Sequence, residues 1–266
     1  MDSIYGHDIL YAGANVAVIP ESICADSISE ANQRAASLKR AAEAVRTKSG
    51  LQPLIIPEDK WHHQREMIRS RILSHLNIFT QIYARNCEVR KIDKSTAAGF
   101  LDANHSYGNA ACRYRYGLFL KRHTGHNAGS ADIETGTLVA VATFSNARKW
   151  IKGDKIVRSY EWTRYASLPE VRLSGGMGKL LNAFIDEVKP DDIMSYADLE
   201  WSEGKVYETL GFELEGQKGP VNFCVDTSAW TRHALRPDYR LPSTAALKFH
   251  TNLGSNKYRM KLTDYH

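Results

Sequence analysis

The sequence lacks the features that mark a membrane protein or a disulfide-linked protein. No apolar run approaches the ~20 residues that a membrane-spanning helix needs. The first residues, MDSIYGHDILYAG, have neither the basic start nor the apolar stretch of a secretion signal. The four cysteines (Cys24, Cys87, Cys112 and Cys224) lie far apart and form no C-x-x-C pair. We therefore expect a cytoplasmic protein with buried free thiols, without a disulfide framework, a zinc ribbon or another metal site.

Internal repeats and low-complexity tracts are also missing, and the composition is that of an ordinary soluble protein. The chain has 266 residues, which is enough for one large domain or two small ones. Hydrophobic residues make up 43% of the chain and charged residues 24%, so a core of normal size is expected. The net charge of +5 favours an anionic partner only weakly, because many ordinary enzymes are equally basic.

Residues 1–82 alternate between strand and helix patterns. Short apolar segments at Asn15–Pro20 and Pro53–Pro57 are typical of buried strands. The segment Ser29–Lys48 between them has apolar residues at helical spacing, and Asp59 is a candidate N-cap for a second amphipathic helix. Strand, helix, strand and helix in this order predict a small βαβα unit with parallel strands.

Residues 83–228 follow a different pattern, in which strands outnumber helices. The predicted order is β-α-β-β-β-turn-α-β-α-β-β, and the second and third strands form a hairpin. The strand segments are CEVRKID, YRYGLFLKR, GTLVAVATFS, SYEWTRYAS, DIMSYAD, FELEG and VNFCVD. Residues 229–266 form a basic extension, either wrapping around the body or lying solvated upon it.

A glycine-rich turn lies between the SYEWTRYAS strand and a helix. Backbone N–H groups and the positive end of the helix dipole make such a helix start suitable for a phosphate, and glycines allow close approach. The turn lacks the G-K-S/T of a P-loop, and its strand follows a hairpin, unlike the βαβ setting of a Rossmann fingerprint. Its candidate donor-binding residues are Arg172, Leu173, Ser174, Gly175, Gly176, Met177, Gly178 and Lys179.

This turn resembles the acyl-donor motif of the GNAT superfamily, Q/R-x-x-G-x-G/A. Arg172 and Gly175 match the motif, and Leu180 and Leu181 fall where the family has paired leucines. Met177 stands where the family has glycine or alanine. The resemblance implies a GNAT-like mixed, mostly antiparallel twisted sheet flanked by helices. It also implies an acyl-CoA donor, acetyl-CoA above all, or another activated acyl carrier.

A second segment, Gly204–Gly216, resembles the late GNAT segment in which a tyrosine precedes L-G-F. In that family the tyrosine often protonates the leaving thiolate, and Tyr207 stands at its position. A phenol is an adequate general acid for a thiolate, because the two pKa values differ by about two units. Packing in the core is the alternative role for a tyrosine on a short helix.

The end of the DIMSYAD strand supplies candidate residues for the acceptor. Asp198 is the candidate general base, or the group that orients an acceptor amine, with Glu200 as the second choice and Trp201 as a further contact. A carboxylate at the end of a strand has a plainer alternative role, capping the helix that follows.

The end of the first helix of residues 83–228 supplies further candidates, because GNAT acceptors usually bind there. His105 has an intrinsic pKa suited to proton transfer, and Asn104 precedes it. The alternative for His105 is a favourable interaction with the C-terminal end of the helix dipole. Arg164 and Tyr165, on the SYEWTRYAS strand, are candidates for the same acceptor site.

Two motifs are similar to GNAT-like domains of phage proteins of the homing-endonuclease type, and more distantly to Mom-type enzymes that modify adenine in DNA. They are N-H-x-x-G at Asn104–Gly108 and S-Y-A-D-x-x-W-S-x-G-x-x-Y-E-x-L-G-F at Ser195–Phe212. We therefore expect an N-acyltransferase that acts on an amine, with an exocyclic amine of a nucleic-acid base as the expected target. The alternatives are a non-catalytic module that binds nucleic acid or a partner, and an acetyltransferase for a small-molecule or protein amine.

Overall fold

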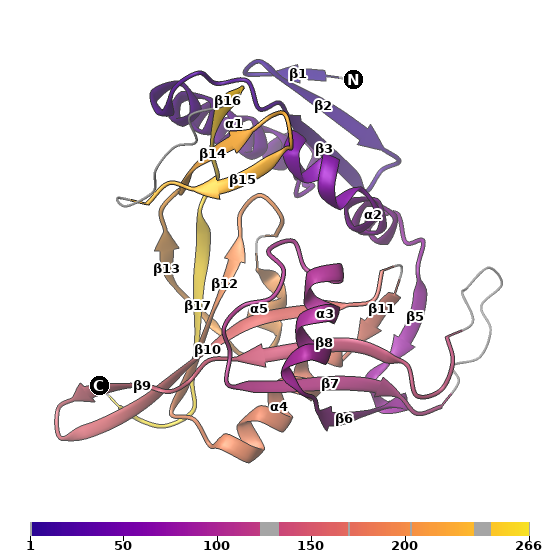
Figure 1. The fold of residues 1–266 in the computed structure, drawn as a ribbon, viewed down its shortest axis with the longest axis vertical. Coiled ribbons are helices and arrows are strands. Elements are labelled where there is room, and N and C mark those ends of the chain that lie inside the picture. Colours follow the sequence, from indigo (N-terminus) through magenta and orange to yellow (C-terminus); the bar gives the residue numbers. More distant parts are fainter. Residues whose placement is uncertain (1, 123–132, 170, 203, 237–245, 266) are drawn as a thin grey trace. The chain divides into compact units, whose positions relative to one another are not determined.

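The computed structural model describes the chain except residues 1, 123–132, 170, 203, 237–245 and 266. The chain forms two compact units, each built from several stretches of sequence (Figure 1). The first unit contains Met1–Ile68, Tyr196–Lys205 and Glu215–Lys257, and the second contains Arg69–Ser195, Val206–Leu214 and Tyr258–His266. The boundaries that we predicted after residues 82 and 228 each fall inside one of these units. No helix among the described residues is long and apolar enough to span a bilayer.

The first unit opens with a four-stranded sheet in the order β1-β2-β3-β4. Its strands are β1 (Asp2–Ile4), β2 (His7–Ala12), β3 (Val16–Glu21) and β4 (Leu54–Pro57). Strands β3 and β4 are parallel, which confirms the predicted βαβα unit. The β1–β2 hairpin was not predicted, although its two turn residues, Tyr5 and Gly6, both have positive φ as a type I′ turn requires.

Two long helices follow β3 and β4. Helix α1 (Ile28–Ser49) begins at an N-cap, Ser27, whose side chain accepts a hydrogen bond from the Glu30 N–H, and it ends at Gly50 with φ of 70°. Its buried face packs on the sheet, and this core contains Ile9, Ala17, Ile19, Ala35, Leu38, Ala41, Ala42, Val45, Ile55 and Leu253. Helix α2 (Glu58–His75) bends at Gln64.

A three-stranded antiparallel sheet also belongs to the first unit and has the order β15-β14-β16. Its strands are β14 (Asn222–Asp226), β15 (Thr231–Ala234) and β16 (Leu247–Thr251). Our assignment of VNFCVD, now β14, as the last strand of the GNAT-like sheet was therefore wrong. Its apolar alternation correctly indicated a buried strand, but alternation does not identify the strand with which it pairs.

The second unit has the predicted fold class, a mixed and mostly antiparallel sheet flanked by helices. The sheet order is β13-β17-β12-β10-β8-β7-β6, and β9 pairs with β10. The strands are β6 (Cys87–Lys91), β7 (Tyr114–Leu120), β8 (Leu138–Phe144), β9 (Arg148–Lys152), β10 (Lys155–Ser167), β12 (Asp192–Asp198), β13 (Glu213–Lys218) and β17 (Ser255–Lys261). Strand β17, from the basic extension, takes the sheet position that we had assigned to VNFCVD.

Helices cover both faces of this sheet. Helix α3 (Lys94–Asn104) packs through Leu101 on Val141 of β8. Helix α4 (Gly176–Val188) packs through Phe184 on Phe144, with the two rings stacked at 3.9 Å between centroids. Val141 and Phe144 lie an odd number of residues apart on one strand, so their side chains point to opposite faces. The remaining elements are β5 (Thr80–Tyr83), η1 (Ala84–Asn86), β11 (Val171–Ser174) and α5 (Lys205–Thr209).

The cysteines are all free thiols, as predicted, but they are not all buried. Cys87 and Cys224 are buried, and burial raises the pKa of both thiols. Cys112 is half-buried, and Cys24 is exposed, so the prediction of burial was wrong for Cys24.

Candidate functional site

The glycine-rich turn connects β11 to α4 in the second unit. Gly175 is the N-cap of α4 and has φ of 77°, a left-handed conformation that a glycine adopts without strain. No side chain among the described residues caps this helix start. The first N–H groups of α4 are therefore available to an anion.

The turn is fixed in place by the segment around β5, which pairs with β11 in parallel. The amide of Gln81 donates to the carbonyl of Arg172 at 2.9 Å and to the Ser174 hydroxyl at 3.0 Å. The ammonium group of Lys179 donates to the carbonyls of Ala84 and Cys87. The polar groups of Ser174 and Lys179 thus hold the turn, while their contact with a donor stays a prediction.

Packing requires a glycine at one position of the turn and crowds a second position. A Cβ on Gly176 would lie 2.5 Å from side-chain carbons of Leu173 and 3.2 Å from the Tyr165 hydroxyl. A Cβ on Gly178 would lie 3.3 Å from Leu210, the residue that follows α5. The paired leucines, Leu180 and Leu181, are buried on the inner face of α4. Close packing therefore accounts for much of the motif, and it places the turn beside Tyr165.

Basic side chains gather near this turn. Burial and the charges of Arg71 and Arg172 lower the pKa of His75, and burial lowers the pKa of Arg71. The guanidinium carbon of Arg172 lies 5.1 Å from the centre of the Phe79 ring. Sequence reasoning missed Arg71 and His75, because they belong to a helix far from the motif along the chain. The two arginines make the surroundings of β11 electropositive, whereas the lowered pKa leaves His75 neutral at neutral pH.

The pairing of β10 with β12 ends after three residues of each strand. The two strands are parallel and pair only at Ser159–Glu161 with Asp192–Met194, whereas β10 continues along β8 to Ser167 with a bulge between Trp162 and Arg164. The Ser195 hydroxyl lies 3.0 Å from the Trp162 carbonyl, the next link between the strands. The backbone of β10 beyond this point therefore has no strand partner on its β12 side among the described residues.

Tyr207 lies at this point. Its hydroxyl is 2.9 Å from the Ser195 hydroxyl, whose single proton serves either this oxygen or the Trp162 carbonyl. Its ring stacks on Tyr258 at 5.3 Å and meets Trp162 edge-on at 6.2 Å between centroids. Burial raises the pKa of Tyr207, and the hydrogen bond from Ser195 opposes this rise. The phenol is thus protonated at neutral pH. Its proton is available to another acceptor while Ser195 donates to it; when Ser195 donates to the Trp162 carbonyl, the phenol donates to Ser195 instead.

The other predicted acceptor residues of the second unit form a turn after α3. The His105 Nδ1 accepts a hydrogen bond from the Tyr107 N–H at 3.1 Å, and the Gly108 N–H donates to the His105 carbonyl at 2.8 Å. Arg164 Nε donates to the Gly108 carbonyl at 3.0 Å. The Asn104 amide donates to the Phe100 carbonyl, so it bonds to its own helix. The N-H-x-x-G motif therefore builds a turn that Arg164 fastens to β10.

Asp198, Glu200 and Trp201 belong to the first unit, whereas Tyr207, His105 and the glycine-rich turn belong to the second. Asp198 acts as a cap: its carbonyl accepts from the Trp201 N–H and its carboxylate from the Glu200 N–H, both at 3.0 Å. These bonds close the turn after β12 and lie before α5, which begins at Lys205. The assignment of Asp198, Glu200 or Trp201 to an acceptor stays a prediction.

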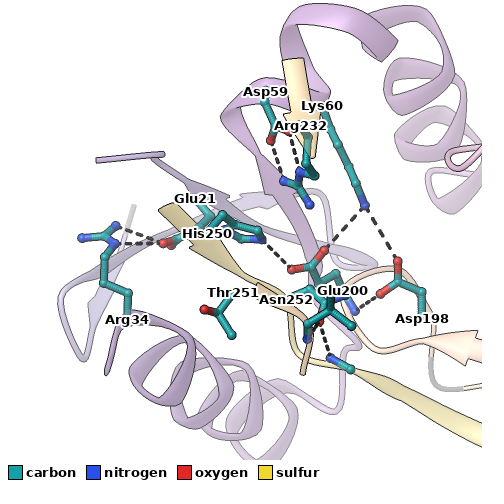
Figure 2. Close-up of polar contacts among 12 residues, drawn as sticks. Glu21, Arg34, Asp59, Lys60, Asp198, Glu200, Arg232, His250, Thr251 and Asn252 are labelled. Carbon is teal, nitrogen blue, oxygen red and sulfur yellow. Dashed lines mark hydrogen bonds and ion pairs between the residues drawn. The ribbon is translucent and has the colours of Figure 1, made fainter. Parts of the chain in front are cut away.

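Glu200 is the centre of a buried ion-pair network (Figure 2). Its side chain is 0% exposed, with Oε1 3.1 Å from His250 Nε2 and Oε2 3.5 Å from Lys60 Nζ. Lys60 Nζ is also 3.8 Å from Asp198 Oδ2. Burial alone would raise the pKa of Glu200, but His250 and the charge of Lys60 outweigh burial and hold this pKa below its usual value.

The network extends to neighbouring pairs in the first unit, which Figure 2 also shows. Asp59 accepts two hydrogen bonds from the Arg232 guanidinium, each 2.6 Å long, and Glu21 accepts from Arg34 Nε at 3.1 Å. No group of acidic, histidine or cysteine residues in the described part of the chain is arranged to hold a metal ion. Sequence reasoning missed this network, because Lys60, His250 and Arg232 carry no motif and meet Glu200 only in the fold.

The chain matches no protein-family model and no curated protein sequence. Among solved structures it is similar to one described as the NatC complex bound to Gag peptide and CoA, with 14% identity over 67% of this chain and 99% of that chain, and a TM-score of 0.38. The match to an acetyltransferase of the GNAT family from Bacillus anthracis has 14% identity, covers 66% of this chain and 95% of that chain, and has a TM-score of 0.35. The match to Eis1 from Mycobacterium abscessus has 14% identity, covers 52% of this chain and 33% of that chain, and has a TM-score of 0.37. With TM-scores this low, these likenesses decide nothing about the chemistry of this chain.

Proposed function

We propose that the chain is an N-acyltransferase that moves an acyl group from a CoA-type thioester to an amine. The observation that carries the proposal is the position of Tyr207. Its hydroxyl lies within hydrogen-bond distance of the Ser195 hydroxyl at the point where β10 and β12 stop pairing, in the same compact unit as the glycine-rich turn. A protonated phenol beside unpaired strand backbone suits the leaving-group end of an acyl transfer.

The residues present fit a donor that carries phosphates. The uncapped start of α4 offers backbone N–H groups, and Arg71 and Arg172 make the region basic. The backbone of β10 after Trp162 lies beside no strand on its β12 side among the described residues, and an extended chain of the pantetheine kind would bond there beside the side-chain bonds that the Thr163 and Arg164 carbonyls already accept. Acetyl-CoA is the donor that we expect, by the resemblance of the turn to the GNAT motif.

The reaction balances with one proton donated and one lost. The amine nitrogen attacks the thioester carbonyl carbon, a C–N bond forms, the C–S bond breaks, and the sulfur leaves with the bonding pair. Tyr207 donates its proton to the thiolate and is reprotonated from solvent. The attacking nitrogen loses one proton to solvent, or to Asp198 or His105, the bases predicted from the sequence. In the fold His105 Nδ1 accepts from the Tyr107 N–H, so the neutral ring carries its proton on Nε2, and His105 could take a proton only at Nδ1 after that hydrogen bond breaks.

An exocyclic amine of a nucleic-acid base is the acceptor that we propose. The similarity of Asn104–Gly108 and Ser195–Phe212 to DNA-modifying and phage-linked domains supports it, as does the basic net charge. A base inside a duplex would have to leave the stack, which costs a few kcal/mol. A small-molecule or protein amine is the rival acceptor.

Donor binding is tested first, by the shift in melting temperature on adding CoA or acetyl-CoA. Met177→Glu places a negative charge in the first turn of α4, which favours the helix but repels an anionic donor. Met177→Gln is the matched neutral control. We expect a ligand-dependent rise in melting temperature for the wild type and the control, and a smaller rise for Met177→Glu. Equal responses in all three would remove the turn from the donor site.

Catalysis is tested by expressing the chain in cells, digesting the DNA and RNA, and searching for a new nucleoside mass. Tyr207→Phe removes only the hydroxyl and should lower the yield about 100-fold. Tyr258→Phe keeps the ring that stacks on Tyr207 and serves as the control. A new mass of equal yield in wild type and Tyr207→Phe would refute the role of Tyr207. Binding of acetyl-CoA without any modified nucleoside would favour the rival acceptors, and failure of both tests would favour a non-catalytic module.

A further inference from the structure

Strands β9 and β10 form a hairpin that projects beyond the sheet of the second unit (Figure 1). Lys155 pairs with Lys152, Ile156 with Ile151 and Val157 with Trp150. The loop between the strands is Gly153-Asp154, and Gly153 has φ of 56°, as the first position of a type II′ turn requires. The hairpin is therefore a regular two-stranded ribbon with a tight end.

The outer part of this ribbon is basic and exposed. All residues of β9 are exposed, and three of them are cationic: Arg148, Lys149 and Lys152. Large apolar side chains accompany these charges, because Ile151 is 82% exposed and Trp150 is 52% exposed. The cross-strand partner of Ile151, Ile156, is 65% exposed. A fold without use for them rarely displays so many large apolar side chains in one place.

The cations lie on both faces of the ribbon. Side chains alternate along a strand, so Arg148, Trp150 and Lys152 share one face while Lys149 and Ile151 occupy the other. A flat bilayer would meet only one face at a time. A groove with negatively charged walls on both sides would meet the cations of both faces at once.

A second copy of the chain fits the ribbon poorly. Strand β9 is an edge strand that carries three positive charges and no negative charge. Two such edges would repel each other, and lysine on an edge strand is a common means of preventing strands from pairing between chains. The charge of the ribbon is complementary to a polyanion instead.

We propose that the β9–β10 hairpin is a DNA-binding arm that enters a groove of the duplex. Arg148, Lys149 and Lys152 contact phosphates on both sides of the groove, and Trp150 and Ile151 pack against sugars or bases. This inference deepens the proposed function, on which it rests for the target, by identifying the part of the chain that holds duplex DNA. A two-stranded ribbon is of the right width for the major groove.

The test measures fluorescence anisotropy of a labelled duplex of about 20 base pairs with the full chain and no acyl donor, from about 50 to about 200 mM salt. We expect the double variant Lys149→Gln/Lys152→Gln to weaken binding to all DNA sequences. It should also reduce the slope of the logarithm of the binding constant against the logarithm of the salt concentration by about two. The double variant Lys94→Gln/Lys121→Gln removes two exposed lysines elsewhere in the second unit and should leave the slope unchanged. Trp150→Ala should weaken binding about tenfold without changing the slope.

Other outcomes overturn the proposal. If both double variants lose the same affinity and slope, the chain binds DNA only through its overall charge. If the hairpin variants bind DNA like the wild type but lose binding to vesicles containing phosphatidylserine, the arm contacts membranes. If they change only the sedimentation coefficient, the arm joins two copies. Because no acyl donor is present, a negative result leaves the acyl-transfer tests with Tyr207 and Met177 unaffected, and failure of those tests leaves this one intact.

Discussion

Replacing Glu200 by glutamine tests whether the ion-pair network stabilises the first unit. The side chain keeps its size and its Oε1, which still accepts from His250, but its charge is lost. Lys60, whose side chain is 8% exposed, then retains Asp198 at 3.8 Å as its nearest carboxylate in Figure 2. The glutamine amide also presents a donor to the Lys60 ammonium group in place of an acceptor.

The expected loss follows from these distances. At an effective dielectric constant of about 20, unit charges 3.5 Å apart, as in the Lys60–Glu200 pair, attract by about 5 kcal/mol. Breaking a buried pair on one side typically costs about 3–5 kcal/mol. Asp198 compensates in part, and glutamine is less costly to bury than a carboxylate. We therefore expect the free energy of unfolding to fall by about 2–4 kcal/mol.

The pH dependence gives an independent check. The pKa of Glu200 is lower in the folded chain than in the unfolded chain, where it is about 4.3. The contribution of Glu200 to the free energy of unfolding is therefore fully present above the unfolded pKa and is lost as the pH falls through the folded pKa. The difference between wild type and Glu200→Gln should therefore shrink as the pH drops below about 4.

The assay is urea unfolding followed by circular dichroism, with amide hydrogen exchange of the first unit as a local readout. Asp26→Asn is the control, because it breaks an ion pair with Lys248 in which Asp26 is exposed, and it should cost less than about 1 kcal/mol. Equal losses for Glu200→Gln and Asp26→Asn, or a difference that stays constant between about pH 3 and pH 7, would refute the reasoning.

Three further predictions concern packing and reactivity. Gly254→Ala puts a Cβ 2.4 Å from the Lys218 carbonyl oxygen at φ of 81° and should lower the free energy of unfolding by about 3–4 kcal/mol. Gly153→Ala, whose Cβ meets no atom within 4 Å, should lower it by about 1–2 kcal/mol. Urea unfolding compares the two variants, and equal losses would contradict the clash. Phe184→Ala removes the buried ring that stacks on Phe144 and should cost about 3–5 kcal/mol, whereas Leu214→Ala at an exposed site should cost less than about 0.5, again by urea unfolding. Cys24 should react with a thiol reagent in the native chain, while Cys87 and Cys224 react only after unfolding, because burial raises the pKa of their thiols. Mass spectrometry identifies the labelled thiols. Labelling of Cys87 in the native chain would contradict the prediction.

Local pattern in the sequence was enough to locate most elements. Helix α1 follows from its apolar spacing, and its ends lie within one residue of the prediction. Strand β9 was missed, because its charged and exposed residues lack the alternation of a half-buried strand. The β1–β2 hairpin was missed for a similar reason, since its strands are short and largely exposed.

Local sequence pattern likewise identified only part of the candidate site. The glycine-rich turn and Tyr207 could be chosen from sequence, because each is a motif within a short stretch. Their joint location in the second unit depends on β10, whose Tyr165 touches the turn and whose Trp162 touches Tyr207. Arg71 and His75 could not be chosen, since nothing in their own segment indicates that they lie near Arg172.

The sequence by itself determined the fold class, the βαβα start and the helix that follows the glycine-rich turn, because these depend on periodicity and on residues close along the chain. Only the tertiary structure decided which strand completes the large sheet, and which carboxylates are buried as ion pairs. Strand β17 completes that sheet and β14 does not, although β14 is the more buried of the two. The physical reason is that strand pairing and charge pairing join residues far apart in sequence, and a local pattern records burial without recording the partner.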